Sequence, residues 1–170
     1  MKRLCSFLLA LLALTVLTVP AGAEELAVEA EACLLMEKTT GEVLYAVNEH
    51  EPLEPASVTK IMTILLVMEA IDSGQLQYGD VVTASAHACS MGGSQIWLEE
   101  NEQMTVSDML KAVCVVSAND CAVALAEAVS GSEEAFVERM NQRAAELGME
   151  DTHFCNATGL PAEGHVTSAY

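Results

Sequence analysis

A serine and a lysine lie three residues apart where an apolar stretch of the chain begins, in Pro55-Ala56-Ser57-Val58-Thr59-Lys60. Side chains at that spacing lie on one face of a helix, so the hydroxyl of Ser57 and the amine of Lys60 are expected one turn apart. A serine becomes a nucleophile when a nearby base takes its proton, and a lysine whose pKa burial lowers from ~10.4 can be that base. The pair therefore indicates acyl-transfer chemistry. The alternative is that Ser57 only caps the helix.

A second polar group, Ser117-Ala118-Asn119, interrupts the apolar pattern between two predicted helices. Polar side chains on such a loop can project into a cleft. The intervening elements could fold this loop against Ser57 and Lys60. The four polar side chains Ser57, Lys60, Ser117 and Asn119 are therefore candidates for one site.

The apolar pattern predicts a β-hairpin followed by a block of helices. Two short apolar runs, at 33–37 and 43–46, flank a turn-forming segment at 38–42. A helix is expected from Ser57 to about Ser73. Because this helix is apolar nearly all round, it is expected to be the central helix that other elements wrap.

The rest of the chain is predicted to be mostly helical. We expect a short strand at 81–83, a tight turn at 92–94, helices over 105–116, 121–129 and 132–147, and a tail over 150–170 without a clear period. In the first of these helices Thr105 is the expected cap, and Met109, Leu110, Val113 and Val116 the expected apolar face. Two hairpin strands alone make a marginal sheet, so the predicted class is α+β with an incomplete sheet.

Length and charge limit the functional classes. The 170 residues suggest one domain, and a formal net charge of −18 argues against binding to nucleic acid or to an anionic membrane surface. A positive start, a short apolar core and small residues before Glu24 predict a secretory signal peptide over 1–23. The alternative, a membrane anchor, needs a longer apolar run. We therefore expect export and a mature catalytic domain over 24–170.

The cysteines do not form a complete disulfide framework. Of six, Cys5 falls in the signal peptide, and the odd number that remains cannot pair fully within one chain. His87-x-Cys89 and His153-x-Cys155 could be argued as zinc ligands, although neither spacing is typical of a zinc site. We expect the cysteines to be small buried residues instead, and we predict no metal and no cofactor.

Several segments, in this order, match landmarks of one enzyme family. They are Thr40-Gly41-Glu42-Val43-Leu44-Tyr45, Pro55-Ala56-Ser57-Val58-Thr59-Lys60-Ile61-Met62-Thr63, Gly92-Gly93-Ser94, Ser117-Ala118-Asn119-Asp120, 156–161 and His165-Val166-Thr167-Ser168-Ala169-Tyr170. On these segments the mature chain resembles the serine-type D-alanyl-D-alanine carboxypeptidases, the low-molecular-weight penicillin-binding proteins of peptidase family S11. The resemblance implies a fold of the β-lactamase/transpeptidase type.

The resemblance also implies a mechanism. Ser57 would attack the carbonyl between the two D-alanines of a peptidoglycan stem peptide, and Lys60 would take its proton. Ser117 would relay a proton to the leaving D-alanine, and Asn119 would bind the substrate's amide. β-Lactams would acylate the same serine. The implied place of action is outside the cytoplasm, at the outer face of the cytoplasmic membrane or in the periplasm.

The chain also departs from the family pattern. The family's third motif, Lys-Thr-Gly, does not follow Asn119, and Lys38-Thr39-Thr40-Gly41 has an extra threonine and lies in the predicted hairpin turn. We therefore expect this chain to be the N-terminal part of a longer protein. The closing strands of the sheet and any membrane anchor would lie in the remainder.

Two alternatives stay open at this point. A class A β-lactamase is the nearest, but its candidate glutamate, in Glu138-Arg139-Met140-Asn141, falls on an apparent helix whose polar residues are expected to face solvent. The other alternative is a non-catalytic exported relative that binds peptidoglycan or is inactive.

Overall fold

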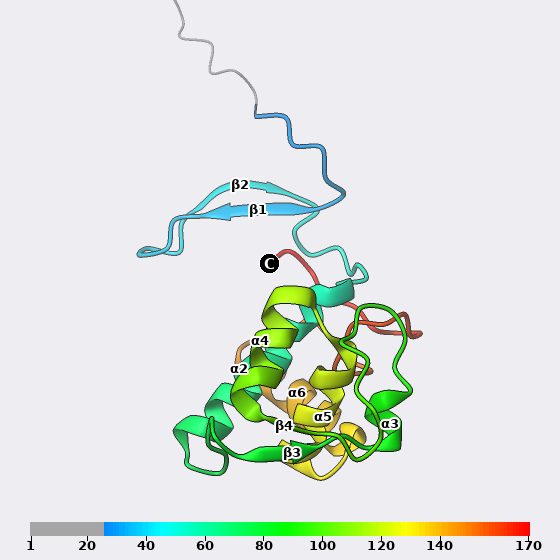
Figure 1. The fold of residues 1–170 in the computed structure, drawn as a ribbon. Coiled ribbons are helices and arrows are strands. Elements are labelled where there is room, and N and C mark those ends of the chain that lie inside the picture. The colour runs from blue at the N-terminus through cyan, green and yellow to red at the C-terminus, as the bar shows by residue number, and fades with distance from the viewer. Residues whose placement is uncertain (1–25) are drawn as a thin grey trace, which may run out of the picture. The chain divides into compact units, whose positions relative to one another are not determined.

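The computed structural model describes residues 26–170, and Glu31–Tyr170 form one compact unit (Figure 1). The predicted signal peptide lies outside the described residues. The elements in chain order are β1 (Cys33–Met36), β2 (Val43–Val47), the 3-10 turn η1 (Ala56–Thr59), α2 (Lys60–Asp72), β3 (Val81–Thr83), α3 (Ala86–Cys89), β4 (Gln103–Thr105), α4 (Val106–Val116), α5 (Asn119–Ser130) and α6 (Glu133–Glu146). The predicted α+β class is confirmed.

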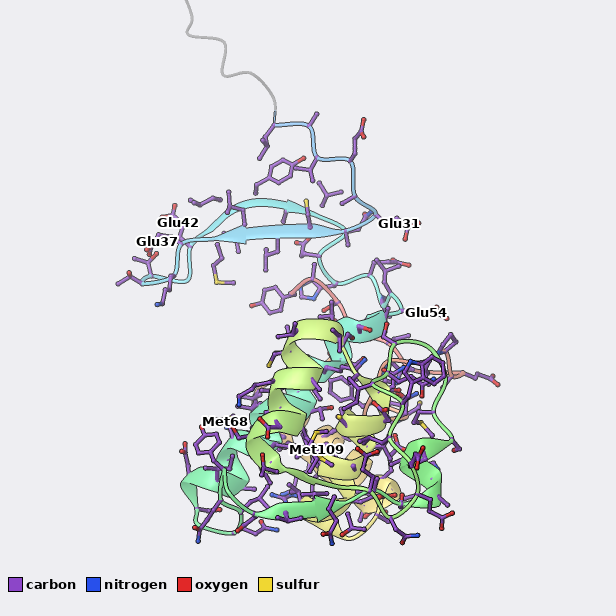
Figure 2. All side chains as sticks on the ribbon, in the orientation of Figure 1. Glu31, Glu37, Glu42, Glu54, Met68 and Met109 are labelled. Carbon is purple, nitrogen blue, oxygen red and sulfur yellow. The ribbon has the colours of Figure 1, made fainter. Side chains whose placement is uncertain are left out.

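The predicted hairpin is present, with β1 and β2 antiparallel and an irregularity between Leu35 and Met36. Its turn is held by Glu37, which lies at the end of the hairpin in Figure 2. The Glu37 carboxylate accepts hydrogen bonds from the backbone N–H groups of Thr39 and Thr40 and from the Thr40 hydroxyl, and these bonds lower the pKa of Glu37 to about 2. The Lys38–Gly41 segment is thus a hairpin turn, as predicted.

The central helix is α5, and the prediction that the helix after Ser57 would be central is wrong. Every residue from Asn119 to Ala126 is buried, and α2, α3, α4 and α6 all contact α5. Its alanine-rich sequence explains the close approach, since small side chains let several neighbours pack on one helix. In α2, by contrast, Ile61 is 69% exposed, so this helix is covered on part of its surface only.

Two helix starts are confirmed, whereas the helix expected from Ser57 opens with the 3-10 turn η1 and the one expected from Cys121 already begins at Asn119. Thr105 caps α4 by accepting the N–H of Asp108, and Ser132 caps α6 by accepting the N–H of Ala135. In α4, Val106 is buried while Val116 is 48% exposed, so the prediction that Val116 belongs to the apolar face is wrong. Val116 is the last residue of α4, directly before Ser117, where the backbone leaves the helix in the left-handed conformation.

The segment between α2 and α4 holds the expected strand and two elements that the sequence did not predict. The expected strand, β3 at Val81–Thr83, pairs antiparallel with β4, and the short helix α3 follows it. The helix α3 and the strand β4 are the unpredicted elements. The tail after residue 150 has no helix or named strand, but isolated bridges join His153 to Val166 and Leu53 to Thr167. Across residues 26–170, no helix combines the length and apolar character needed to cross a bilayer.

The cysteines of the described chain are free thiols. Cys121 is fully buried in α5, where burial raises the pKa of its thiol to about 12. Cys114 is exposed and Cys33, Cys89 and Cys155 are only half-buried, so the expectation that the cysteines are buried is confirmed for Cys121 alone. In the alternative zinc motif, His87 pairs with Glu133 at 2.6 Å, and no group of potential metal ligands forms within residues 26–170.

Candidate active site

Ser57 and Lys60 are in direct contact. Ser57 lies in η1 and is exposed, and Lys60, the first residue of α2, is 4% exposed. The Nζ atom of Lys60 is 3.2 Å from Oγ of Ser57. No side-chain capping bond is made at the start of η1 or of α2, so the alternative in which Ser57 serves only as a cap finds no support.

The environment of Lys60 fits a lysine that can act as a base. Its Nζ donates a hydrogen bond of 2.6 Å to the backbone oxygen of Thr158. Burial lowers the pKa of Lys60, because the charged form loses hydration. None of the ion pairs among residues 26–170 involves Lys60. When the amine is neutral, one N–H can stay on Thr158 while the lone pair accepts the proton of Ser57.

Ser117 and Asn119 hold unsatisfied polar atoms. Ser117 ends α4 in the left-handed conformation, with φ 59° and ψ 38°, and its Oγ is buried without a hydrogen-bond partner. Asn119 donates from Nδ2 to the oxygen of Gly92 and from its backbone N–H to the oxygen of Ser94, each at 2.7 Å. Its Oδ1 is buried and also lacks a partner. Strained backbone and unpaired buried atoms are both typical of functional sites.

Contacts with two other segments bring Asn119 toward Lys60. A Cβ placed on Gly93 would lie 3.0 Å from Nδ2 of Asn119 and 3.6 Å from a methyl carbon of Leu160. Leu160 is two residues from Thr158, whose oxygen binds Lys60. No side-chain hydrogen bond within residues 26–170 joins Ser117 or Asn119 directly to Ser57 or Lys60. Their catalytic and binding roles stay a prediction.

Three residues that sequence reasoning left without a role support the site. Asn156 shapes the turn that presents Thr158: its Oδ1 accepts the backbone N–H groups of Thr158 and Gly159. His165 is 3% exposed, and its Nε2 atom lies 2.7 Å from the hydroxyl of Thr59. Thr59 is the residue directly before Lys60 in the chain. The third residue is Thr158, which acts through its backbone oxygen, and a backbone oxygen cannot be recognised from the type of residue. In the sequence, Asn156, Thr158 and His165 were indicated only by lying in two segments of the family pattern.

Asp120 is the other residue that was missed. Its side chain is completely buried, and its carboxylate accepts the backbone N–H groups of Ile96 and Leu98, each at 3.1 Å from Oδ2, and of Cys121. The sequence did offer a signal, because Asp120 directly precedes the apolar residues Cys121-Ala122-Val123. An acidic residue in such a buried segment is expected to have hydrogen-bond partners, since acidic residues are almost never fully buried without them.

Comparison with known proteins agrees with this geometry. The family model of the D-alanyl-D-alanine carboxypeptidases, peptidase S11, matches residues 19–170. The chain belongs to this family. It is 52% identical, over an alignment of 177 positions, to the D-alanyl-D-alanine carboxypeptidase DacF of Bacillus subtilis, covering 100% of this chain and 46% of the relative. The chain thus spans less than half of the length of that relative.

Solved structures of family members share the fold. DacD of Francisella tularensis superposes with a TM-score of 0.82 at 36% identity, over 86% of this chain and 35% of the other. Penicillin-binding protein 6B of Escherichia coli gives a TM-score of 0.81 at 38% identity, over 88% and 49% of the two chains. The predicted β-lactamase/transpeptidase type of fold is confirmed.

The segment behind the β-lactamase alternative has a structural role in part. Glu138 is exposed on α6, as expected for a solvated helix face. The same expectation is wrong for Asn141, whose side chain donates to the oxygen of Phe154 and accepts the N–H of Phe154. Asn141 therefore ties α6 to the tail of the S11 domain.

Proposed function

We propose that this protein is a serine-type D-Ala-D-Ala carboxypeptidase, which removes the terminal D-alanine of peptidoglycan stem peptides through an acyl-enzyme on Ser57. The observation that carries the proposal is the 3.2 Å contact between the amine of the buried residue Lys60 and the hydroxyl of the exposed residue Ser57. Membership of the S11 family supports the reaction class and the substrate.

The first half of the reaction forms the ester. The Ser57 oxygen attacks the carbonyl carbon of the penultimate D-alanine while the Ser57 proton passes to Nζ of Lys60. The C–N bond then breaks, and the leaving D-alanine takes a proton through Ser117. Oδ1 of Asn119 has no partner, so it can accept an N–H of the part of the substrate that stays on Ser57. Hydrolysis of the ester by water releases the shortened peptide and restores the hydroxyl of Ser57.

Covalent labelling by penicillin tests the proposal. Intact-mass analysis of the full-length gene product incubated with benzylpenicillin should show one adduct, and peptide mapping should place it on Ser57. Ser57→Ala should abolish the adduct, and Lys38→Ala, in the hairpin turn, should leave it unchanged. A folded protein without an adduct would refute acyl transfer and favour the non-catalytic alternative. Release of D-alanine from a peptide ending in D-Ala-D-Ala separates a carboxypeptidase from a β-lactamase.

The proposed place of action is outside the cytoplasmic membrane. This follows from the substrate, since peptidoglycan stem peptides are trimmed there, and the predicted signal peptide over 1–23 supports it. Fractionation of cells that express the intact gene should find the protein in the extracytoplasmic fraction, with an N-terminus at Glu24. A protein that keeps Met1 and stays in the cytoplasm would contradict this.

A further inference from the structure

Trp97 combines two features that are costly for a tryptophan. Its side chain is 76% exposed, although aromatic side chains gain most from burial. Its backbone has φ 66°, in the left-handed region that bulky residues rarely adopt. Such a conformation persists only where the surroundings impose it, and it is concentrated at functional sites.

The conformation is imposed by Asp120. The buried carboxylate of Asp120 accepts the N–H groups of Ile96 and Leu98, the two residues on either side of Trp97. Leu98 is buried and Ile96 packs against the core, so both neighbours point inward and the indole is left outside. The carboxylate thus fixes the backbone on both sides of Trp97.

The same loop borders the candidate active site. Asp120 directly follows Asn119, and Asn119 itself bonds to the oxygens of Gly92 and Ser94. Gly93 lies against Leu160, in the segment that carries the oxygen bound by Lys60. In Figure 1 the loop between α3 and β4 runs beside the start of α5. Residues 92–98 are therefore bonded to the element that starts with Asn119.

We propose that the indole of Trp97 contacts the acyl side of the ligand, meaning the part of the stem peptide that stays on Ser57, or the acyl side chain of a penicillin. The proposal rests on the function proposed above. Asn119 offers its free Oδ1 to an N–H of that acyl part, and Trp97 lies on the loop bonded to Asn119 and Asp120. The leaving D-alanine carries a carboxylate, which like charges repel, and the exposed Glu99 and Glu100 follow Trp97 by two and three positions.

Paired ligands test this contact. Acylation rates are compared for benzylpenicillin and for aminopenicillanic acid, which has the same reactive nucleus but no acyl side chain. Trp97→Ala should slow acylation by benzylpenicillin about tenfold, as expected for a lost aromatic contact, and leave aminopenicillanic acid essentially unchanged. Trp97→Phe should keep most of the benzylpenicillin rate. An equal loss with both ligands, or no loss with either, would overturn the proposal.

Two controls keep the result specific. Tyr78→Ala removes another half-exposed aromatic, outside the 92–98 loop, and should change neither rate. Trp97 is the only tryptophan of the 170 residues, so the fluorescence that Trp97→Phe removes should change on acylation by benzylpenicillin and not by aminopenicillanic acid. If neither ligand acylates the wild-type protein, the proposed function is overturned together with this inference. If acylation is normal but the fluorescence of Trp97 does not change, only this inference is overturned.

Discussion

The backbone of Gly159 lies directly against the carbonyl group of Ala56, the residue before Ser57. A Cβ at position 159 would lie 1.8 Å from the oxygen and 2.4 Å from the carbon of that carbonyl, and Gly159 has φ +83°. The segment after residue 150 can therefore pack against η1, the turn that carries Ser57, only if residue 159 has no side chain. This contact joins the turn that carries Ser57 to the turn that carries the Thr158 oxygen.

Gly159→Ala should disturb both stability and acylation. An alanine at this position is strained by the left-handed backbone, and its Cβ also clashes with the carbonyl of Ala56. Because the two energetic costs add, we expect a loss of about 2–5 kcal/mol in unfolding free energy and a much slower acylation of Ser57. Gly164→Ala is the matched control, because Gly164 has φ +81° and no atom within 4 Å of its Cβ position. That variant should lose only about 1–2 kcal/mol. Equal losses in denaturant unfolding would mean that the contact with Ala56 is unimportant.

Lys60→Ala should slow the acylation of Ser57 about a hundredfold to ten-thousandfold, the usual contribution of a general base. In the wild type the rate should rise with pH as the Lys60 amine loses its proton. Since burial lowers the pKa of Lys60, that rise should occur below the range of an ordinary lysine. Stopped-flow acylation at several pH values measures it. Lys111→Ala, at an exposed lysine paired with Asp108, should leave the profile unchanged, and a flat wild-type profile would contradict the role of Lys60.

His165 should make the protein less stable in mild acid. Its Nδ1 accepts the N–H of Cys155, so the proton lies on Nε2, which donates to the hydroxyl of Thr59. Burial lowers the pKa of His165 below 6.5, so below that pH the unfolded chain binds a proton that the folded chain does not. Stability is therefore fully present above pH 6.5 and is lost as pH falls toward the folded pKa.

Denaturant midpoints at about pH 5.5 and about pH 7.5 measure this effect. His165→Gln should reduce the difference between the two midpoints. His87 acts in the opposite direction, because its bond to Glu133 raises its pKa, so its contribution is present at low pH and lost as pH rises. His87→Gln should therefore enlarge the difference. An unchanged difference in His165→Gln would show that His165 does not titrate with unfolding.

Asp120→Asn should destabilise the loop that carries Trp97. Asparagine keeps the shape but loses the charge that strengthens the bonds to Ile96 and Leu98, and its amide group brings donors toward other donors. We expect a loss of about 1.5–3 kcal/mol, measured by denaturant unfolding. Asp108→Asn, on the exposed side of α4, should cost much less, because solvent screens exposed charges. Similar costs for the two variants would contradict the role given to the buried carboxylate.

The sequence by itself determined the local parts of this protein. The spacing of Ser57 and Lys60 was sufficient to place them in contact, because a helical turn fixes which side chains share a face. Thr105 and Ser132 marked helix starts for the same local reason. The segments of the family pattern were sufficient to assign the S11 family.

The tertiary structure alone decided which helix is central and what surrounds the site. Apolar content favoured α2, yet α5 is central, because the small side chains of α5 let more neighbours approach. The Thr158 oxygen bound by the Lys60 side chain and the carbonyl of Ala56 against Gly159 are contacts of backbone oxygens with residues about a hundred positions away. Pairings of that kind depend on how the chain folds back on itself. Neither residue type nor spacing encodes them.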